Sequence, residues 1–157
     1  GTFPIGFLFL LTFVGGCAGS TACGIKIFRF QILYKATQSM LNRLIHPHGV
    51  FIPRYNGSPV GEDVLSSVLN FFFLFVLLFA ALSLGLVATG GDFITAVSSA
   101  ATAISNVGPG LGPIVGPTGT FQSLPDTAKW LLSAGMLIGR LEIFSVVILF
   151  LPTFWRQ

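Results

Sequence analysis

The chain has 157 residues, of which 53% are hydrophobic and only 8% are charged, and its formal net charge is +3. This composition lies outside the range of soluble globular domains and is typical of a membrane protein, so a lipid bilayer is its expected surrounding. The basic residues are confined to particular segments, which indicates membrane topology and excludes a nucleic-acid interface.

The first predicted element is a broken transmembrane helix over residues 1–46. Its apolar run at residues 3–14 is too short to cross a bilayer and is followed by GGCAGSTACG at 15–24. Each glycine inside a helix costs roughly 1 kcal/mol relative to alanine, so residues 15–24 predict an intramembrane loop. A GxxxG helix-packing face is the alternative. The start at Gly1, without a basic leader, argues against a signal peptide and favours a piece of a longer protein.

A cytoplasmic loop is predicted at residues 47–63, because 47–61 contain three prolines and three glycines. The acidic pair Glu62 and Asp63 suits a helix N-terminus. No charged residue lies between Asp63 and Asp92. We therefore predict a transmembrane helix over 64–89.

A shorter helix is predicted over residues 92–105, with Asp92 as its N-cap. At about 1.5 Å per residue it covers only about 20 Å, so it can enter a bilayer but cannot cross it. Residues 106–125 are rich in glycine and proline, and a second full transmembrane helix is predicted over 126–151. Residues 64–151 thus form one repeat.

The basic residues orient these elements. Residues 24–63 and the C-terminal end carry Lys26, Arg29, Lys35, Arg43, Arg54 and Arg156, whereas 89–125 contain no lysine or arginine. By the positive-inside rule, residues 25–63 and the C-terminus are cytoplasmic and 89–125 are external. The helix over 92–105 must then enter the bilayer and return. The predicted fold class is an all-α membrane protein with a channel-like helix, re-entrant pore helix, helix repeat, preceded by a broken transmembrane helix.

The sequence SNVGPGLG at 105–112 predicts an ion filter in the return segment, with ion-binding residues Asn106, Val107, Gly108, Pro109 and Gly110. Glycine permits backbone angles that direct successive carbonyls toward an ion, and Pro109 has no N–H to leave unpaired. A row of carbonyl oxygens can replace the water shell of K+, which we expect at Val107 and Gly108. The alternative is a simple external turn, since Gly-Pro pairs are common in loops.

Arg140 lies near the middle of the last predicted helix. A cation there costs at least about 2.5–3.5 kcal/mol on insertion scales, so a cavity or a partner is expected. Glu142 is two positions away and points to a different helix face. Arg140 could form an electrostatic barrier beneath the filter or hold the 15–24 loop by its carbonyls. A purely structural link between helices is the alternative.

Six motifs occur in order along the chain: GGCAGST with GIK, LIHP, SNVGPGLG, AKW, GRLEIF and PTFWR. Together they resemble the C-terminal part of the TrkH-type potassium uptake proteins of the Trk/Ktr/HKT superfamily. The resemblance covers essentially the whole chain. It implies four tandem helix, pore-helix, helix repeats around one ion path, of which this chain supplies the last helix of the third repeat and all of the fourth.

The resemblance also implies roles for individual residues. Residues 106–110 would be the fourth filter strand, and Arg140, with Glu142, would form a gate or electrostatic barrier facing a gating loop. The gating loop would consist of Gly15, Gly16, Cys17, Ala18, Gly19, Ser20, Thr21 and Gly24. The family usually has three glycines after Ser20-Thr21, whereas this chain has Ala22-Cys23-Gly24, which bears on gating more than on ion selection.

The predicted function is potassium uptake through a pore-forming subunit in the inner membrane, without enzymatic activity. K+ is the transported ion, and no cofactor is expected in this chain. The resemblance implies a homodimer with a cytoplasmic nucleotide-binding regulatory subunit, so nucleotide would belong to the partner. The alternatives are a secondary transporter for an anionic solute, built on broken helices, and a structural subunit of a membrane complex. The short helix presents its C-terminus to the filter, which disfavours anions.

Overall fold

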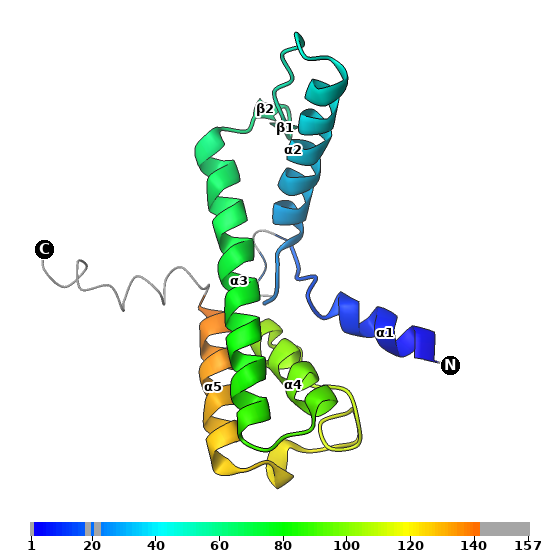
Figure 1. Cartoon of the computed structure of the whole chain (residues 1–157), viewed down its shortest axis with the longest axis vertical. Helices are drawn as coiled ribbons and strands as arrows, with labels where there is room; N and C mark the ends of the chain where they lie inside the picture. The colour runs from blue at the N-terminus through cyan, green and yellow to red at the C-terminus, as the bar shows by residue number, and fades with distance from the viewer. Residues whose placement is uncertain (1, 18–19, 21–22, 142–157) are drawn as a thin grey trace, which may run out of the picture.

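The computed structural model describes residues 2–17, 20 and 23–141. Within these residues the chain forms five α-helices, a two-stranded hairpin and one short 3-10 helix. The α-helices are α1 (Thr2–Leu11), α2 (Ile27–Ile45), α3 (Glu62–Ala88), α4 (Phe93–Ser105) and α5 (Asp126–Arg140). The hairpin strands are β1 (Arg54–Tyr55) and β2 (Ser58–Pro59), and the 3-10 helix is η1 (Phe121–Ser123). In Figure 1 α2 lies beside one end of α3, and α4 and α5 lie beside the other end.

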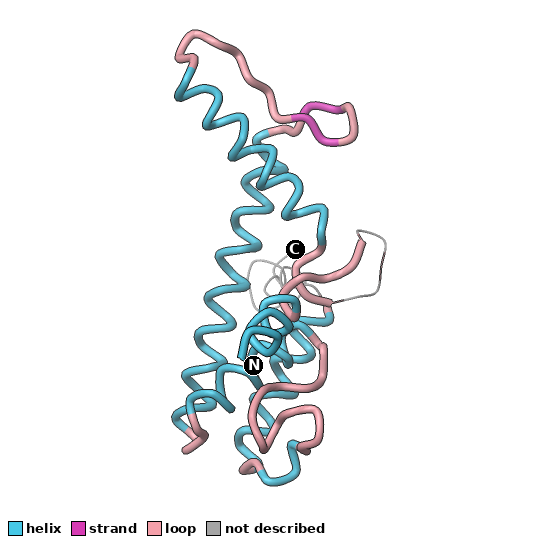
Figure 2. Tube along the Cα trace, turned by 90° about the vertical axis from the view of Figure 1, so that its right-hand side faces the viewer, coloured by secondary structure: helices cyan, strands magenta, loops and turns pink. Residues whose placement is uncertain are grey.

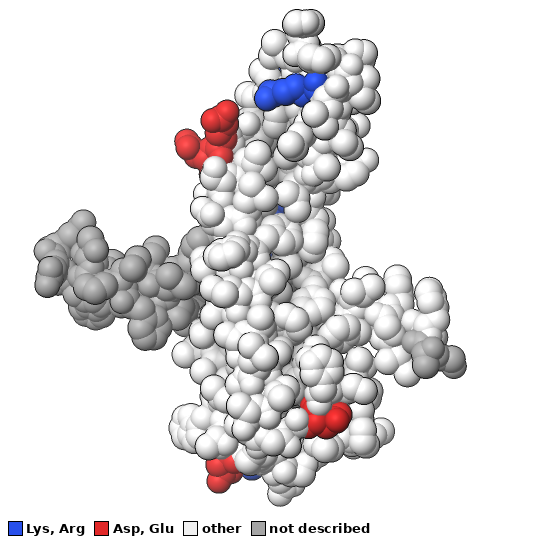
Figure 3. All heavy atoms as spheres, viewed as in Figure 1, with Lys and Arg blue, Asp and Glu red and all other residues white. Residues whose placement is uncertain are grey.

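Helix α3 forms the long axis of the molecule. Among the described residues it alone is long and apolar enough to cross a membrane, with 27 residues and no charge after its first turn. Glu62 and Asp63 occupy that first turn, where the helix dipole favours acidic side chains. Figure 3 shows that charged side chains on this face gather toward the two ends of the molecule. The helical fold is that expected of an all-α membrane protein, and the face in Figure 3 is apolar along the middle of α3.

Helix α4 is packed between α3 and α5, and small side chains make this possible. Ala100, Ala101 and Ala103 are completely buried. Ala100 and Ala103 share a core cluster with Leu86 of α3 and Leu132 of α5. Alanine and serine let neighbouring helix backbones approach closely where larger side chains would keep them apart. The short helix is consequently enclosed by the two longer ones over most of its surface, which suits a pore helix.

The helix predicted to break near residue 15 is broken in the structure. Helix α1 ends at Leu11 and α2 begins at Ile27, and the two sides of the gap are joined by backbone hydrogen bonds. The Ile25 N–H donates to the Phe13 carbonyl at 2.9 Å, and the Gly15 N–H donates to the Ile25 carbonyl at 2.9 Å. Gly15 thus lies outside any helix, so it does not contribute to a helical GxxxG face.

Helix α2 is held on α3 by a buried cation. The guanidinium of Arg29 lies 3.8 Å from the ring centroid of Phe71 and 5.1 Å from that of Phe28. Arg29 is only 9% exposed, and a cation over an aromatic face is stabilised by the ring quadrupole. This contact fixes the start of α2, directly after the broken segment, against the transmembrane helix.

The segment predicted as a plain loop at 47–63 contains a β-hairpin. Arg54 pairs with Pro59 and Tyr55 with Ser58, and Figure 2 shows this hairpin projecting to one side of the helices. Asn56 and Gly57 form the turn with φ of 50° and 84°. Asn-Gly is a strong signal for a two-residue hairpin turn, because both positions tolerate positive φ. The prediction of an element-free loop is therefore corrected here.

The predicted helices 64–89, 92–105 and 126–151 correspond to α3, α4 and α5. Asp92 stands at the N-cap of α4, where its backbone carbonyl accepts from the Ala96 N–H at 2.8 Å; its side chain makes no capping bond. Helix α5 begins at Asp126 as predicted but ends at Arg140, with Leu141 as its C-cap, so Arg140 lies in the last turn and not near the middle of a helix. Residues 142–151 of the predicted helix, including Glu142, lie outside the described residues.

Candidate functional site

The candidate filter begins with a reversal of the chain at the end of α4. Asn106 adopts the left-handed conformation, with φ of 51° and ψ of 40°. Its N–H donates to the Ala103 carbonyl at 3.1 Å, and the Val107 N–H donates to the Thr102 carbonyl at 3.1 Å. A left-handed residue after the last helical turn satisfies free carbonyls and turns the chain back. The reversal directs the following residues toward the start of the same helix.

The segment after Asn106 then runs back along α4. The Ser98 hydroxyl donates to the Leu111 carbonyl at 3.2 Å, and a Cβ on Gly112 would lie 3.8 Å from Oγ1 of Thr95. Residues 105 and 111 are therefore near opposite ends of one short helix. A short helix followed by a segment that runs back along it has the geometry of a re-entrant pore loop.

The residues of the candidate filter differ in burial. Asn106, Val107, Gly108 and Pro109 are exposed, whereas Gly110 is buried against Val115 and Ser98. Gly108 has φ of 110°, and no atom lies within 4 Å of the position that a Cβ would take. The strand is thus anchored at Gly110 and presents its first half to open space on this chain.

A cavity of about 410 Å³ lies beside the start of the filter. It brings together three segments that are far apart in the sequence. Its lining residues are Thr12, Val14, Gly15, Gly16, Ser20, Cys23, Ser105, Asn106, Val107 and Arg140. Four predicted groups therefore meet here: the loop glycines, Ser20, the filter start and Arg140. Cys17 and Gly24 belong to the same loop without lining the cavity, and Ala18, Gly19 and Thr21 lie outside the described residues.

Arg140 contacts the broken segment directly. Its Nη1 donates to the Sγ of Cys23 at 3.4 Å, although the two residues are 117 positions apart. The expected contact between Arg140 and the loop is thus made through a side chain at the position where this chain departs from the glycine pattern. The guanidinium of Arg140 brings a positive charge to the lining of the cavity.

Ser105 and Gly15 contribute to the cavity for different reasons. The Ser105 hydroxyl is buried and has no hydrogen-bond partner among the described residues. It belongs to the last turn of α4, where the helix dipole concentrates partial negative charge. A Cβ on Gly15 would lie 2.5 Å from the Cys23 carbonyl oxygen, so the loop closes only around glycine. Sequence reasoning missed three of the lining residues: Thr12 and Val14, which carry no motif, and Ser105, which opens the SNVGPGLG motif but is predicted as the end of the short helix.

Comparison with known proteins decides the family. The profile of the TrkH family, described as cation transport protein, matches residues 2–157. The chain belongs to the TrkH family. The resemblance inferred from the motifs is confirmed.

Two relatives and one solved structure place this TrkH-family chain more closely. It is 56% identical to the Trk system potassium uptake protein TrkI of Halomonas elongata, over 95% of this chain and 30% of the relative. It is 43% identical to the TrkH protein of Vibrio parahaemolyticus, over 98% of this chain and 31% of the relative. The crystal structure of the potassium transporter TrkH from Vibrio parahaemolyticus superposes with a TM-score of 0.89 at 41% identity, over 99% of this chain and 33% of that one. The chain thus spans about a third of the length of the relatives it matches.

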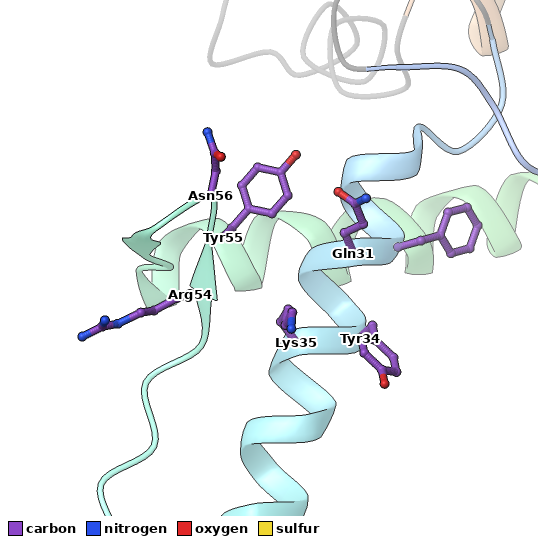
Figure 4. Close-up of a pocket in the computed structure, with 7 residues that line it drawn as sticks. Gln31, Tyr34, Lys35, Arg54, Tyr55 and Asn56 are labelled. Carbon is purple, nitrogen blue, oxygen red and sulfur yellow. The ribbon is translucent and has the colours of Figure 1, made fainter.

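The TrkH-family chain has a second hollow at the α2 end of the molecule, with a volume of about 580 Å³. Figure 4 shows its two walls, which are Gln31, Tyr34 and Lys35 on α2 and Arg54, Tyr55 and Asn56 on the hairpin. Phe30 completes the lining. Two of these residues are basic and none is acidic, so the hollow suits a negatively charged group.

Proposed function

We propose that this chain is part of the pore-forming subunit of a potassium uptake system and supplies one strand of its ion filter. The observation that carries the proposal is the return of residues 106–112 along α4, beside a cavity shared with the broken segment and Arg140. The cavity lies at the C-terminal end of α4, whose partial charge favours a cation over an anion. The proposal keeps the three predicted parts of the chain, which are the broken transmembrane helix at 1–46, the cytoplasmic loop at 47–63 and the pore-forming repeat at 64–151.

K+ is proposed to bind at Val107 and Gly108, within a strand formed by Asn106 to Gly110. Backbone carbonyl oxygens would replace water around the dehydrated ion. The exposed first half of the strand fits this role, because three further strands from the rest of the protein would cover it. K+ is the transported substrate, and the proposal needs no cofactor and no enzymatic step in this chain.

The broken segment is proposed as the gate. Gly15, Gly16, Ser20 and Cys23 of this segment line the cavity at the start of the filter, and Arg140 brings a positive charge to it. A cation on the permeation path repels the transported ion, so Arg140, with Glu142 near it in the sequence, would act as an electrostatic barrier. The contact between Arg140 Nη1 and Cys23 Sγ supports a link between barrier and loop.

The proposed location is the inner membrane, with residues 25–63 and the C-terminus cytoplasmic and 89–125 external. The proposed assembly is a homodimer with a cytoplasmic nucleotide-binding regulatory subunit. The basic hollow between α2 and the hairpin supports a cytoplasmic docking role, since these elements lie at the end of the molecule that the proposal assigns to the cytoplasm (Figure 1). Anionic lipid near Lys35 and Arg54 is the other source of negative charge for this hollow.

The proposed function is tested by uptake. The full-length protein is expected to restore growth at low K+ to cells that lack their own K+ uptake systems, and to raise Rb+ tracer uptake. Uptake of sulfate, phosphate and glutamate should stay at the level of cells with an empty vector. Anion uptake without Rb+ uptake would instead support the secondary transporter built on broken helices.

Reversal of the charge in the basic hollow should weaken regulation without changing the pore. For the double change Lys35→Glu and Arg54→Glu, we expect the response of K+ uptake to the regulatory subunit to fall by about tenfold, as for the loss of paired interface charges. Rb+ uptake without the subunit should remain near the wild-type rate. The measurement is Rb+ uptake in vesicles with and without the purified subunit.

The control is Arg43→Glu, which reverses an exposed charge on α2 that does not line the 580 Å³ hollow. It should leave the response within about twofold of wild type. An equal loss in the control would show that total charge matters and the hollow does not. An unchanged response in the double variant would remove this surface from the proposed interface.

A further inference from the structure

One turn of α5 contacts the exact point at which the filter strand begins. The Nδ2 of Asn106 donates to the Met136 carbonyl at 2.9 Å, across 30 residues of sequence. The backbone N–H groups of Asn106 and Val107 are already bonded to α4. The Asn106 side chain therefore ties the filter start to a second helix, which the backbone bonds do not do.

A glycine makes this contact possible. A Cβ on Gly139 would overlap the Ile104 carbonyl oxygen, would lie 2.8 Å from the Ile104 carbonyl carbon and would lie 3.1 Å from Asn106 Nδ2. Backbone atoms at the end of α4 cannot give way as a flexible side chain can. Any larger residue at position 139 must move α5 away from the filter start.

Gly135 provides a comparison one turn earlier on the same helix. A Cβ on Gly135 would meet Cδ2 of Leu82 at 2.6 Å and Cβ of Ala103 at 3.7 Å. Its closest neighbour is the far end of a flexible leucine, which can adopt another rotamer. Both glycines lie on α5, one turn apart, but only Gly139 lies against the backbone that leads into the filter.

We propose that Asn106, through its side chain, and Gly139 are positioning residues that set the start of the filter strand against α5. This inference rests on the proposed function. It assigns to the two residues a role in ion selection that does not depend on their own carbonyls binding the ion. Arg140 follows Gly139 directly, and its Nη1 contacts Cys23. The same turn of α5 therefore holds both the filter and the broken segment, and a displacement of the filter start reaches the gate through it.

The test uses the full-length protein with three variants. Asn106→Gly removes the donor and keeps a residue that tolerates φ of 51°, so it isolates the side-chain hydrogen bond. Gly139→Ala displaces the helix, and Gly135→Ala is the matched control. The measurements are the ratio of K+ to Na+ preference from competition against Rb+ uptake, the maximal Rb+ rate, and the melting temperature of the purified protein.

We expect Asn106→Gly to lower the K+ to Na+ preference by about fivefold, as for the loss of one hydrogen bond, with a melting temperature near wild type. Gly139→Ala should lower it by about tenfold or more, as for an overpacked helix contact, and Gly135→Ala by less than about twofold. A merely structural role would lower the melting temperature and the maximal rate without changing the preference.

If Asn106→Gly keeps the wild-type K+ to Na+ preference, the proposal is overturned, whatever Gly139→Ala shows. An equal loss in Gly135→Ala and Gly139→Ala would also overturn it, because general helix packing would then suffice. If Gly139→Ala does not fold, Asn106→Gly alone decides. Rb+ uptake by the wild-type protein separates the two proposals. If the wild-type protein does not take up Rb+, the proposed function itself is contradicted.

Discussion

Replacement of Gly108 by serine is expected to lower the preference of uptake for K+ over Na+ by at least about tenfold, with measurable Rb+ uptake retained. Gly108 has φ of 110°, a region that L side chains rarely adopt, and its Cβ position is empty to 4 Å. No described residue of this chain crowds the added side chain, so backbone strain is the effect expected from this chain. A serine at this φ carries strain of about 1–3 kcal/mol and relieves it by rotating the adjacent peptide planes. Because those peptides carry the proposed ion-binding carbonyls, selection should suffer before folding does. Competition of Na+ against Rb+ uptake gives the measurement.

The control for this prediction is Gly90→Ser. Gly90 has φ of 90° and also no atom within 4 Å of its Cβ position, but it lies in the turn between α3 and α4. The two substitutions thus impose the same kind of strain at different places. Equal loss of preference in both variants would show a general effect of strain, and unchanged preference in Gly108→Ser would contradict the filter assignment.

The re-entrant helix could be predicted because the sequence signals for it are local. Asp92 indicates where the helix starts, and the glycine- and proline-rich residues after Ser105 end it at a length too short to cross a bilayer. The absence of lysine and arginine at 89–125 predicts an external side, which stays a prediction. The hairpin was equally local, since Asn56-Gly57 is a strong turn signal. Its omission came from treating proline and glycine content as sufficient to indicate a loop.

The contacts that assemble the site could not be predicted in the same way. The bond between Asn106 and Met136 and the contact between Arg140 and Cys23 join residues 30 and 117 positions apart. Hydrophobic periodicity tells which face of a helix is buried and does not tell which residue on another helix it meets. The departure at Cys23 was visible in the sequence, but its meaning depends on a partner that only the fold supplies.

Replacement of Arg140 by alanine is expected to raise the rate of K+ uptake by about tenfold, which equals about 1.4 kcal/mol off the barrier to permeation. The side chain lines the cavity beside the filter start, together with Ser105 and the broken segment. Two unit charges 4 Å apart repel by about 1 kcal/mol in water and about 4 kcal/mol near a protein surface. Removal of the guanidinium therefore takes away a repulsion of the required size. The initial rate of Rb+ uptake into vesicles gives the measurement.

Arg140→Lys separates the electrostatic barrier from a structural link between helices. Lysine retains the charge but lacks the planar group with several donors, so a barrier predicts uptake near wild type and a structural link predicts uptake like that of alanine. Lys129→Ala serves as the control, because Lys129 is a cation on the same helix that is bonded to Asp126 at 3.1 Å and does not line the cavity. It should leave the rate unchanged. If Arg140→Ala lowers uptake and Arg140→Lys does the same, the guanidinium supports the broken segment through Cys23 and the barrier must be sought elsewhere in the loop.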